Sequence, residues 1–142
     1  MQIYIAIGDD KYRGWLEQSL SELGHQVPRH TSSGHELLQW CETDPPDFLF
    51  VGPHLSDIDS FELINTFSEL RCCPGIAAFE RDDLARAKRI MIDHMMGMII
   101  LPAMPLQLKP AIYVARRRFE QMMKLRRRIE TLRREIYSNP ST

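Results

Sequence analysis

The stretch "PDFLFVGPHLSDIDS" (Pro46–Ser60) decides the fold class of this chain. Its residues from Asp47 to Val51 are almost all apolar, which is typical of a strand buried on both faces of a parallel sheet. Gly52 ends that strand, and acidic residues follow at Asp57 and Asp59. Because doubly wound sheets bind their ligands beyond the carboxyl ends of the strands, we expect any chemistry of the protein near Gly52.

Strand and helix patterns alternate on both sides of this stretch. Periodicity and turn residues predict strands over 2–8, 25–30, 47–51, 75–79 and 97–101. Helical patterns occupy 11–23, 33–42, 60–70, 82–95 and 106–137. Pro28 lacks a backbone N–H and favours an edge position for the second strand. The alternation predicts an α/β fold with a five-stranded parallel sheet in the flavodoxin-like order 2-1-3-4-5 and helices on both faces.

Composition is that of a globular chain. The sequence has 142 residues, of which 44% are hydrophobic and 26% charged. It contains no apolar run of the roughly 18 residues that a membrane span needs, and its first residues lack the basic segment of a signal peptide. We therefore expect a cytoplasmic protein with no membrane contact.

Cysteine and histidine spacing points to no metal or cofactor. Cys41, Cys72 and Cys73 form no Cys-x-x-Cys pair, and their odd number does not suit a disulfide framework. We expect reduced packing residues, and a redox role of the adjacent pair stays open. The five histidines contain no His-x-x-x-His pair.

Charge divides the chain in two. Residues 1–110 carry 9 basic and 16 acidic residues, a net charge of −7, whereas residues 111–137 carry 9 basic and 3 acidic residues, a net charge of +6. Such a division indicates two regions with different partners.

The last predicted helix is too long to serve only as a cover for the sheet. At 1.5 Å per residue, about thirty residues reach about 45 Å, so its second half has to leave the domain. We therefore expect a body at 1–110, a coiled-coil extension at 111–137 and a flexible tail at 138–142. In the extension, apolar residues recur at alternating steps of three and four, which is the seam of a short coiled coil and predicts a homodimer; they are Met122, Leu125, Ile129, Leu132 and Ile136.

Residues 1–110 resemble the receiver (CheY-like) domain of bacterial response regulators. The resemblance lies in "IGDD", "PDFLFVGPHLSDIDSFEL", "PGIAAFERDD" and "GMIILPAMP". It implies that acids after the first strand help to hold Mg²⁺ and that an aspartate at the third strand tip accepts a phosphoryl group. It also implies a Thr or Ser at the end of strand four and a Lys-Pro pair at the end of strand five.

This sequence departs from that pattern at three positions. Asp9 and Asp10 match the acidic pair and Pro102 matches the proline, but Gly52, Phe79 and Leu101 stand at the acceptor, hydroxyl and lysine positions. Phosphoryl transfer to a protein needs a carboxylate nucleophile and cations around the phosphoryl oxygens. We therefore expect a pseudo-receiver, which is not an enzyme and is not phosphorylated. The apolar Phe79 and Leu101 either fix one conformation or simply extend the core.

The sequence leaves two alternatives open. Asp57 or Asp59 would have to accept the phosphoryl group in an atypical phosphorelay receiver. A flavodoxin-like domain would instead bind a small ligand at the strand tips, although "GDDKYRG" lacks the Gly-x-Gly-x-x-Gly phosphate loop.

The order of receiver-like body and long helix resembles AmiR/NasR-type transcription antiterminators. The stretch that carries this resemblance is "LPAMPLQLKPAIYVARRRFEQMMKLRRRIETLRREI". The family implies a regulatory sensor protein as partner and RNA binding by a C-terminal ANTAR domain, which these 142 residues do not include. Arg126, Arg128 and Arg133 flank the seam and would face an acidic body, an acidic partner, RNA phosphate or solvent.

Overall fold

The computed structural model describes residues 1–91 and 97–138. Its centre is a parallel sheet with the strand order β2-β1-β3-β4-β5, which confirms the predicted order and the edge position of Pro28. Every residue of β3 is buried, as expected of a central strand. The strands are β1 (Gln2–Ala6), β2 (Gln26–Thr31), β3 (Phe48–Val51), β4 (Gly75–Glu80) and β5 (Gly97–Leu101).

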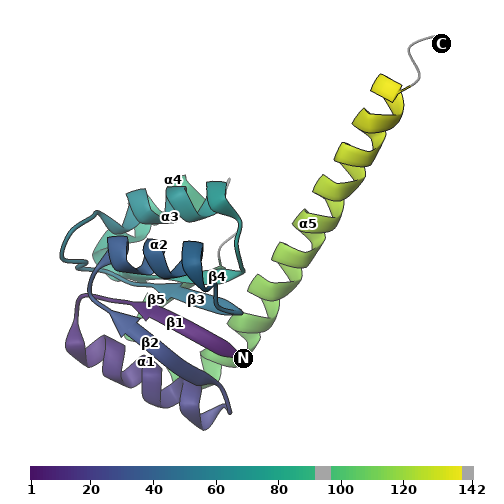
Figure 1. Ribbon diagram of the computed structural model, residues 1–142. Helices are drawn as coiled ribbons and strands as arrows, with labels where there is room; N and C mark the ends of the chain where they lie inside the picture. The colour runs from purple at the N-terminus through teal and green to yellow at the C-terminus, as the bar shows by residue number, and fades with distance from the viewer. Residues whose placement is uncertain (92–96, 139–142) are drawn as a thin grey trace.

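Helices cover both faces of the sheet (Figure 1). One core lies between the sheet and α1 with the first turns of α5, and the other lies between the sheet and α2, α3 and α4. The helices are α1 (Asp10–Glu22), α2 (Gly34–Thr43), α3 (Ser60–Leu70), α4 (Leu84–Met91) and α5 (Leu108–Ser138), with single 3₁₀ turns η1 (Arg81–Asp83) before α4 and η2 (Pro105–Gln107) before α5.

Capping residues fix the ends of the first two helices. Asp9 and Ser33 cap α1 and α2, because their side chains accept hydrogen bonds from backbone N–H groups of the first turn. Gly24 follows α1 with a φ of 89°, which is the left-handed conformation that favours glycine. Residues 92–95 of the helix predicted at 82–95, with His94, lie outside the described residues, as does the tail at 139–142.

Helix α5 runs on far beyond the sheet (Figure 1). Leu108, Ile112 and Ala115 are buried against the body, and Phe119 is half-buried. From Glu120 to Ser138 every residue except Met123 is exposed. The helix has 31 residues, and only its first three turns have a partner within residues 1–91 and 97–138. No described helix is long and apolar enough to cross a bilayer.

Candidate functional site

The tip of β3 has no room for a side chain. A Cβ atom placed on Gly52 would lie 2.4 Å from Cγ1 of Ile7, which follows β1. The Gly52 backbone is also held, since its N–H donates to the Ala6 carbonyl at 2.8 Å and its carbonyl accepts from the Ser60 hydroxyl at 2.7 Å. Ile7 therefore occupies the space that an acceptor side chain at position 52 would need.

The loop after β3 crosses directly over the end of β1. The Gly8 N–H donates to the Pro53 carbonyl at 3.0 Å. A Cβ atom on Gly8 would lie 1.5 Å from the backbone oxygen of His54, whose φ of 61° turns the loop at this point. Two stretches of backbone thus seal the gap between the first and third strand tips.

The two acids after β1 serve the start of α1. Oδ1 of Asp9 accepts from the N–H groups of Lys11 and Tyr12 at 2.9 and 3.1 Å. The Asp10 side chain is 87% exposed and pairs with Arg13, whose Nη1 donates to the Ile7 carbonyl at 2.6 Å. Both carboxylates are therefore engaged on the helix side of the strand tip.

A Mg²⁺ ion does not fit these residues. Magnesium is bound by carboxylate and other oxygen ligands in near-octahedral geometry. Asp9 caps a helix, Asp10 pairs with Arg13, and Gly52 offers no carboxylate. Among the described residues no group of three or more His, Cys, Asp or Glu side chains is arranged to hold a metal ion.

Phe79 and Leu101 lie in different cores. Phe79 is buried on the side of α3, where its ring stacks on Phe61 with 5.1 Å between centroids and 14° between planes. Leu101 is buried on the opposite face, in the core that also contains Ile7. Pro102 follows it through a cis peptide bond and is exposed. The residues predicted to form one pocket therefore do not come together, and Phe79 and Leu101 are core packing residues.

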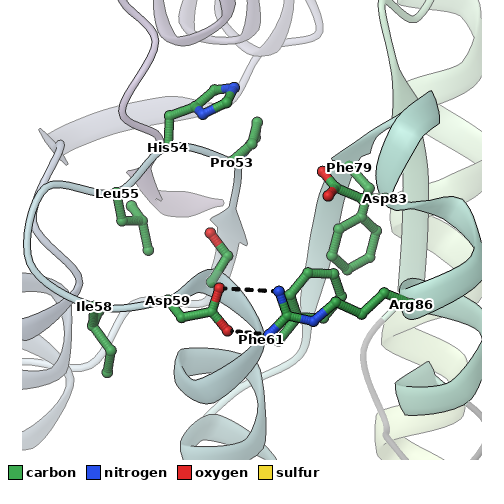
Figure 2. Close-up of a pocket in the computed structure, with 10 residues that line it drawn as sticks. Pro53, His54, Leu55, Ile58, Asp59, Phe61, Phe79, Asp83 and Arg86 are labelled. Carbon is green, nitrogen blue, oxygen red and sulfur yellow. Dashed lines mark hydrogen bonds and ion pairs between the residues drawn. The ribbon is translucent and has the colours of Figure 1, made fainter.

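A cavity of about 240 Å³ remains beside the strand tips, between the loop after β3 and the start of α4 (Figure 2). An ion pair spans it, with Arg86 Nη2 of α4 2.7 Å from Asp59 Oδ2 at the N-cap of α3. The same guanidinium lies 4.0 Å from the centroid of Phe61. His54, which lines the cavity, is paired with Glu80 at the end of β4. These contacts connect α3 to α4 without any phosphoryl group.

Asp57 caps helix α2, a role that the sequence pattern did not predict. Its carboxylate accepts from the Ser33 hydroxyl and from the N–H groups of Gly34 and His35 at 2.8 and 3.3 Å, so it caps α2 from a distant loop. The Ser33 hydroxyl, followed by the two backbone N–H groups, lowers the pKa of Asp57 below its usual value. No local pattern signals this contact, because the partners are more than twenty residues apart.

Replacing Asp57 with alanine is expected to destabilise the protein by about 1 kcal/mol at pH 7, the typical effect of a lost helix cap. Because folding lowers this pKa, the carboxylate's contribution is complete above the usual value of 3.8 and is lost as the pH falls through the lower folded value. Urea unfolding of both proteins at pH 7 and near pH 3 measures the difference. An equal difference at both pH values would contradict the capping role.

The predicted seam is a row of uncovered apolar side chains. Its five residues are between 38% and 71% exposed. Arg126, Arg128 and Arg133 are exposed as well, and none of them forms an ion pair with another residue of the described chain. The seam residues are Met122, Leu125, Ile129, Leu132 and Ile136.

Comparison with known proteins gives the fold. No protein-family model and no curated protein sequence matches the chain. Among solved structures, the signal receiver domain of a modulated diguanylate cyclase from Desulfovibrio desulfuricans G20 superposes with a TM-score of 0.71 at 20% identity, covering 85% of this chain and 97% of that one. The REC domain of the response regulator AraT from Geobacillus stearothermophilus gives 0.66 at 22% identity, over 86% and 97%.

A third structure also aligns over much of α5. It is a fusion protein that carries the trimeric coiled coil of yeast Spc42, with a TM-score of 0.72 at 15% identity over 96% of this chain and 92% of that one. The chain therefore has the fold of response-regulator receiver domains, with a long C-terminal helix added.

Proposed function

We propose that this protein is a pseudo-receiver, a non-enzymatic regulatory domain that acts through protein contacts and not through phosphorylation. The observation that carries the proposal is the sealed strand tip. Ile7 fills the space of a side chain at position 52, and the His54 backbone lies against Gly8. An acceptor carboxylate and its cation have no place in this arrangement.

A fixed conformation follows from the contacts that replace the phosphoryl group. In an active receiver the signal depends on groups that respond to phosphorylation at the strand tips. Here the Phe79 ring is stacked on Phe61, and Arg86 is paired with Asp59. These interactions favour one arrangement of α3 and α4, so partners rather than phosphorylation would change the output.

We also propose that the two parts of the chain have different roles. Residues 1–110 form the regulatory body, and residues 111–137 pair with a second copy as a coiled coil. Support comes from the exposed apolar seam on a helix that continues beyond the body. The helix segment carries a charge of +6 against −7 for the body, so its basic flanks suit an acidic surface.

We place this module in transcription regulation of the antitermination type. The basis is the resemblance of the body and helix to AmiR/NasR-type regulators, together with the receiver fold. In this proposal a sensor protein controls the body, and RNA is contacted by a further C-terminal domain.

Phosphodonors and their analogues are expected to have no effect. Beryllofluoride with Mg²⁺ should leave the amide NMR spectrum unchanged, because Gly52 offers no acceptor carboxylate and the described residues at the strand tips form no cation site. An active receiver treated in parallel should show its usual shifts. Saturable shifts around Gly52 and Leu101 would contradict the proposal.

The atypical-receiver alternative needs its own measurement. Incubation with acetyl phosphate followed by mass spectrometry is expected to give an unmodified mass. Phosphorylation found at Asp57 or Asp59 would replace the pseudo-receiver by that alternative. Both carboxylates are already engaged, Asp57 at the start of α2 and Asp59 with Arg86.

A further inference from the structure

A second cavity lies at the edge of the sheet where β1 and β2 begin, opposite the strand tips. It has a volume of about 270 Å³, and its walls come from Met1, from the connection between α1 and β2 and from the first turns of α5. Figure 1 shows the start of β1 beside α5. The cavity shares no lining residue with the one at the strand tips, so the two are separate sites.

Positive charge gathers on the α5 side of this cavity. Lys109 and Arg116 both line it. They are about two helical turns apart, roughly 10 Å along the helix axis, a separation that their long side chains can span. Neither forms an ion pair within residues 1–91 and 97–138. No acidic side chain is among the described residues that line the cavity. The protein therefore leaves these two cations free to pair with an anion.

His25 adds a polar group to the cavity. It is half-buried, and the Met1 amino group lies 3.3 Å from its Nδ1. Burial lowers the pKa of the His25 imidazole below its usual value of 6.5, and the positive charges of that amino group and of Arg116 lower it further. The imidazole is therefore neutral at pH 7. The same positive charges that disfavour its protonated form would favour a bound anion.

The remaining walls are apolar. Ile112 is buried, whereas Leu23 and Tyr113 are 39% and 63% exposed. A ligand with an apolar part would cover these two exposed side chains, which favours its binding. A cavity of about 150 Å³ holds a benzene molecule. The larger volume of about 270 Å³ therefore suits one ring or a short chain together with an acidic group.

We propose that this cavity binds a small organic anion with one carboxylate or phosphate group. Lys109 and Arg116 hold the acidic group, because ammonium and guanidinium groups form strong charge-assisted hydrogen bonds with carboxylate and phosphate oxygens. The apolar part of the ligand lies against Leu23, Ile112 and Tyr113. This site goes beyond the pseudo-receiver proposal and does not depend on it.

A ligand in this cavity would connect two parts of the molecule. Leu23 and His25 belong to the connection after α1, whereas Lys109 and Arg116 belong to the helix that leaves the body. The anion would lie between these two segments and reduce the repulsion among the positive charges. Because a ligand that binds only the folded state stabilises it, the melting temperature should rise with ligand concentration.

Binding of four small probes to the full chain tests the proposal. Benzoate and phenyl phosphate carry both a ring and a charge, benzamide has the ring without the charge, and inorganic phosphate has the charge without the ring. In an NMR titration at pH 7, benzoate or phenyl phosphate should give saturable amide shifts within residues 23–26 and 109–116. Benzamide and inorganic phosphate should bind at least about tenfold more weakly, since each lacks one of the two kinds of contact.

The same titrations identify the acidic group and can refute the site. Tighter binding of benzoate assigns a carboxylate ligand, and tighter binding of phenyl phosphate assigns a phosphate ester. Benzamide that binds as tightly as benzoate, or inorganic phosphate that binds as tightly as phenyl phosphate, would overturn the proposal. So would the absence of saturable binding by either organic anion at millimolar concentrations, or shifts confined to other parts of the chain.

Arg116→Gln and Arg117→Gln form a matched pair of variants. Both remove one positive charge from adjacent exposed positions of α5, but only Arg116 lines the cavity. Arg116→Gln and Lys109→Gln should each weaken binding of the tighter organic anion about tenfold, the effect of one lost charge-assisted hydrogen bond, and leave benzamide unaffected. Arg117→Gln should bind like the wild type. Equal weakening by Arg116→Gln and Arg117→Gln would mean that the anion follows the general charge of the helix, which refutes a defined site. Thermal unfolding checks that each variant folds, and the comparison of probes on the wild type decides the matter without the variants.

Discussion

Replacing Gly8 with alanine is expected to destabilise the protein by about 3 kcal/mol or more, the upper part of the range for overpacked sites. The reason is the His54 carbonyl oxygen, which would lie 1.5 Å from the new Cβ atom. That neighbour is backbone, so no rotamer change relieves the clash. The loop after β3 would have to move away from β1 and give up the hydrogen bond between Gly8 and Pro53. Urea unfolding at pH 7 measures the change.

Gly14→Ala is the matched control, because it introduces the same methyl group six residues later. A Cβ atom at Gly14 meets nothing within 4 Å, and the residue lies inside α1. Alanine is favoured over glycine in a helix interior by about 1 kcal/mol, so this variant should be more stable than the wild type. A Gly8→Ala protein as stable as the wild type would mean that the strand tips are open, which removes the main support for the pseudo-receiver proposal.

Replacing Ile129 with aspartate is expected to dissociate the proposed coiled-coil dimer and to raise its dissociation constant at least about 100-fold. Ile129 is in the middle of the seam and is 42% exposed in the single chain. Burying a large aliphatic side chain contributes about 1.5 to 3 kcal/mol, and both copies lose it. Each 1.4 kcal/mol corresponds to a factor of ten in affinity. Sedimentation equilibrium of the 16.6 kDa chain measures the constant.

Thr131→Asp provides the control for this experiment. It adds the same charge to the same exposed helix, but its position is turned about 200° away from Ile129 at 3.6 residues per turn. The dissociation constant of the Thr131→Asp dimer should stay close to that of the wild type. If both variants dissociated equally, the seam would not be the contact surface. A wild-type chain that stays monomeric at high concentration would exclude the dimer. A mass of three chains would replace the dimer by a trimer.

Much of the fold was predictable because local patterns and the sheet agree. The buried run Phe48–Val51, the cap at Ser33 and the glycine after α1 are short-range signals, and each lies where the pattern placed it. Once five strands alternate with helices, right-handed crossovers leave few parallel arrangements. The observed order is one of them.

The site was harder to predict, since a sequence match assigns residues to positions but not to contacts. Asp9 and Asp10 follow the first strand as an acidic pair should, yet they cap α1 and pair with Arg13. The pattern did not single out Ile7 and Gly8, yet these two residues determine whether a side chain fits at the strand tips. Arg86 and Asp57 likewise acquire their roles from partners more than twenty residues away.

The sequence by itself determined the order of the elements, the absence of a carboxylate at position 52 and the apolar seam of the last helix, because these are properties of residue type and spacing. Only the tertiary structure decided that Ile7 and the His54 backbone close the strand tips and that Asp57 caps α2. The physical reason is that such contacts depend on the close packing of distant segments, where a single Cβ atom either fits or does not.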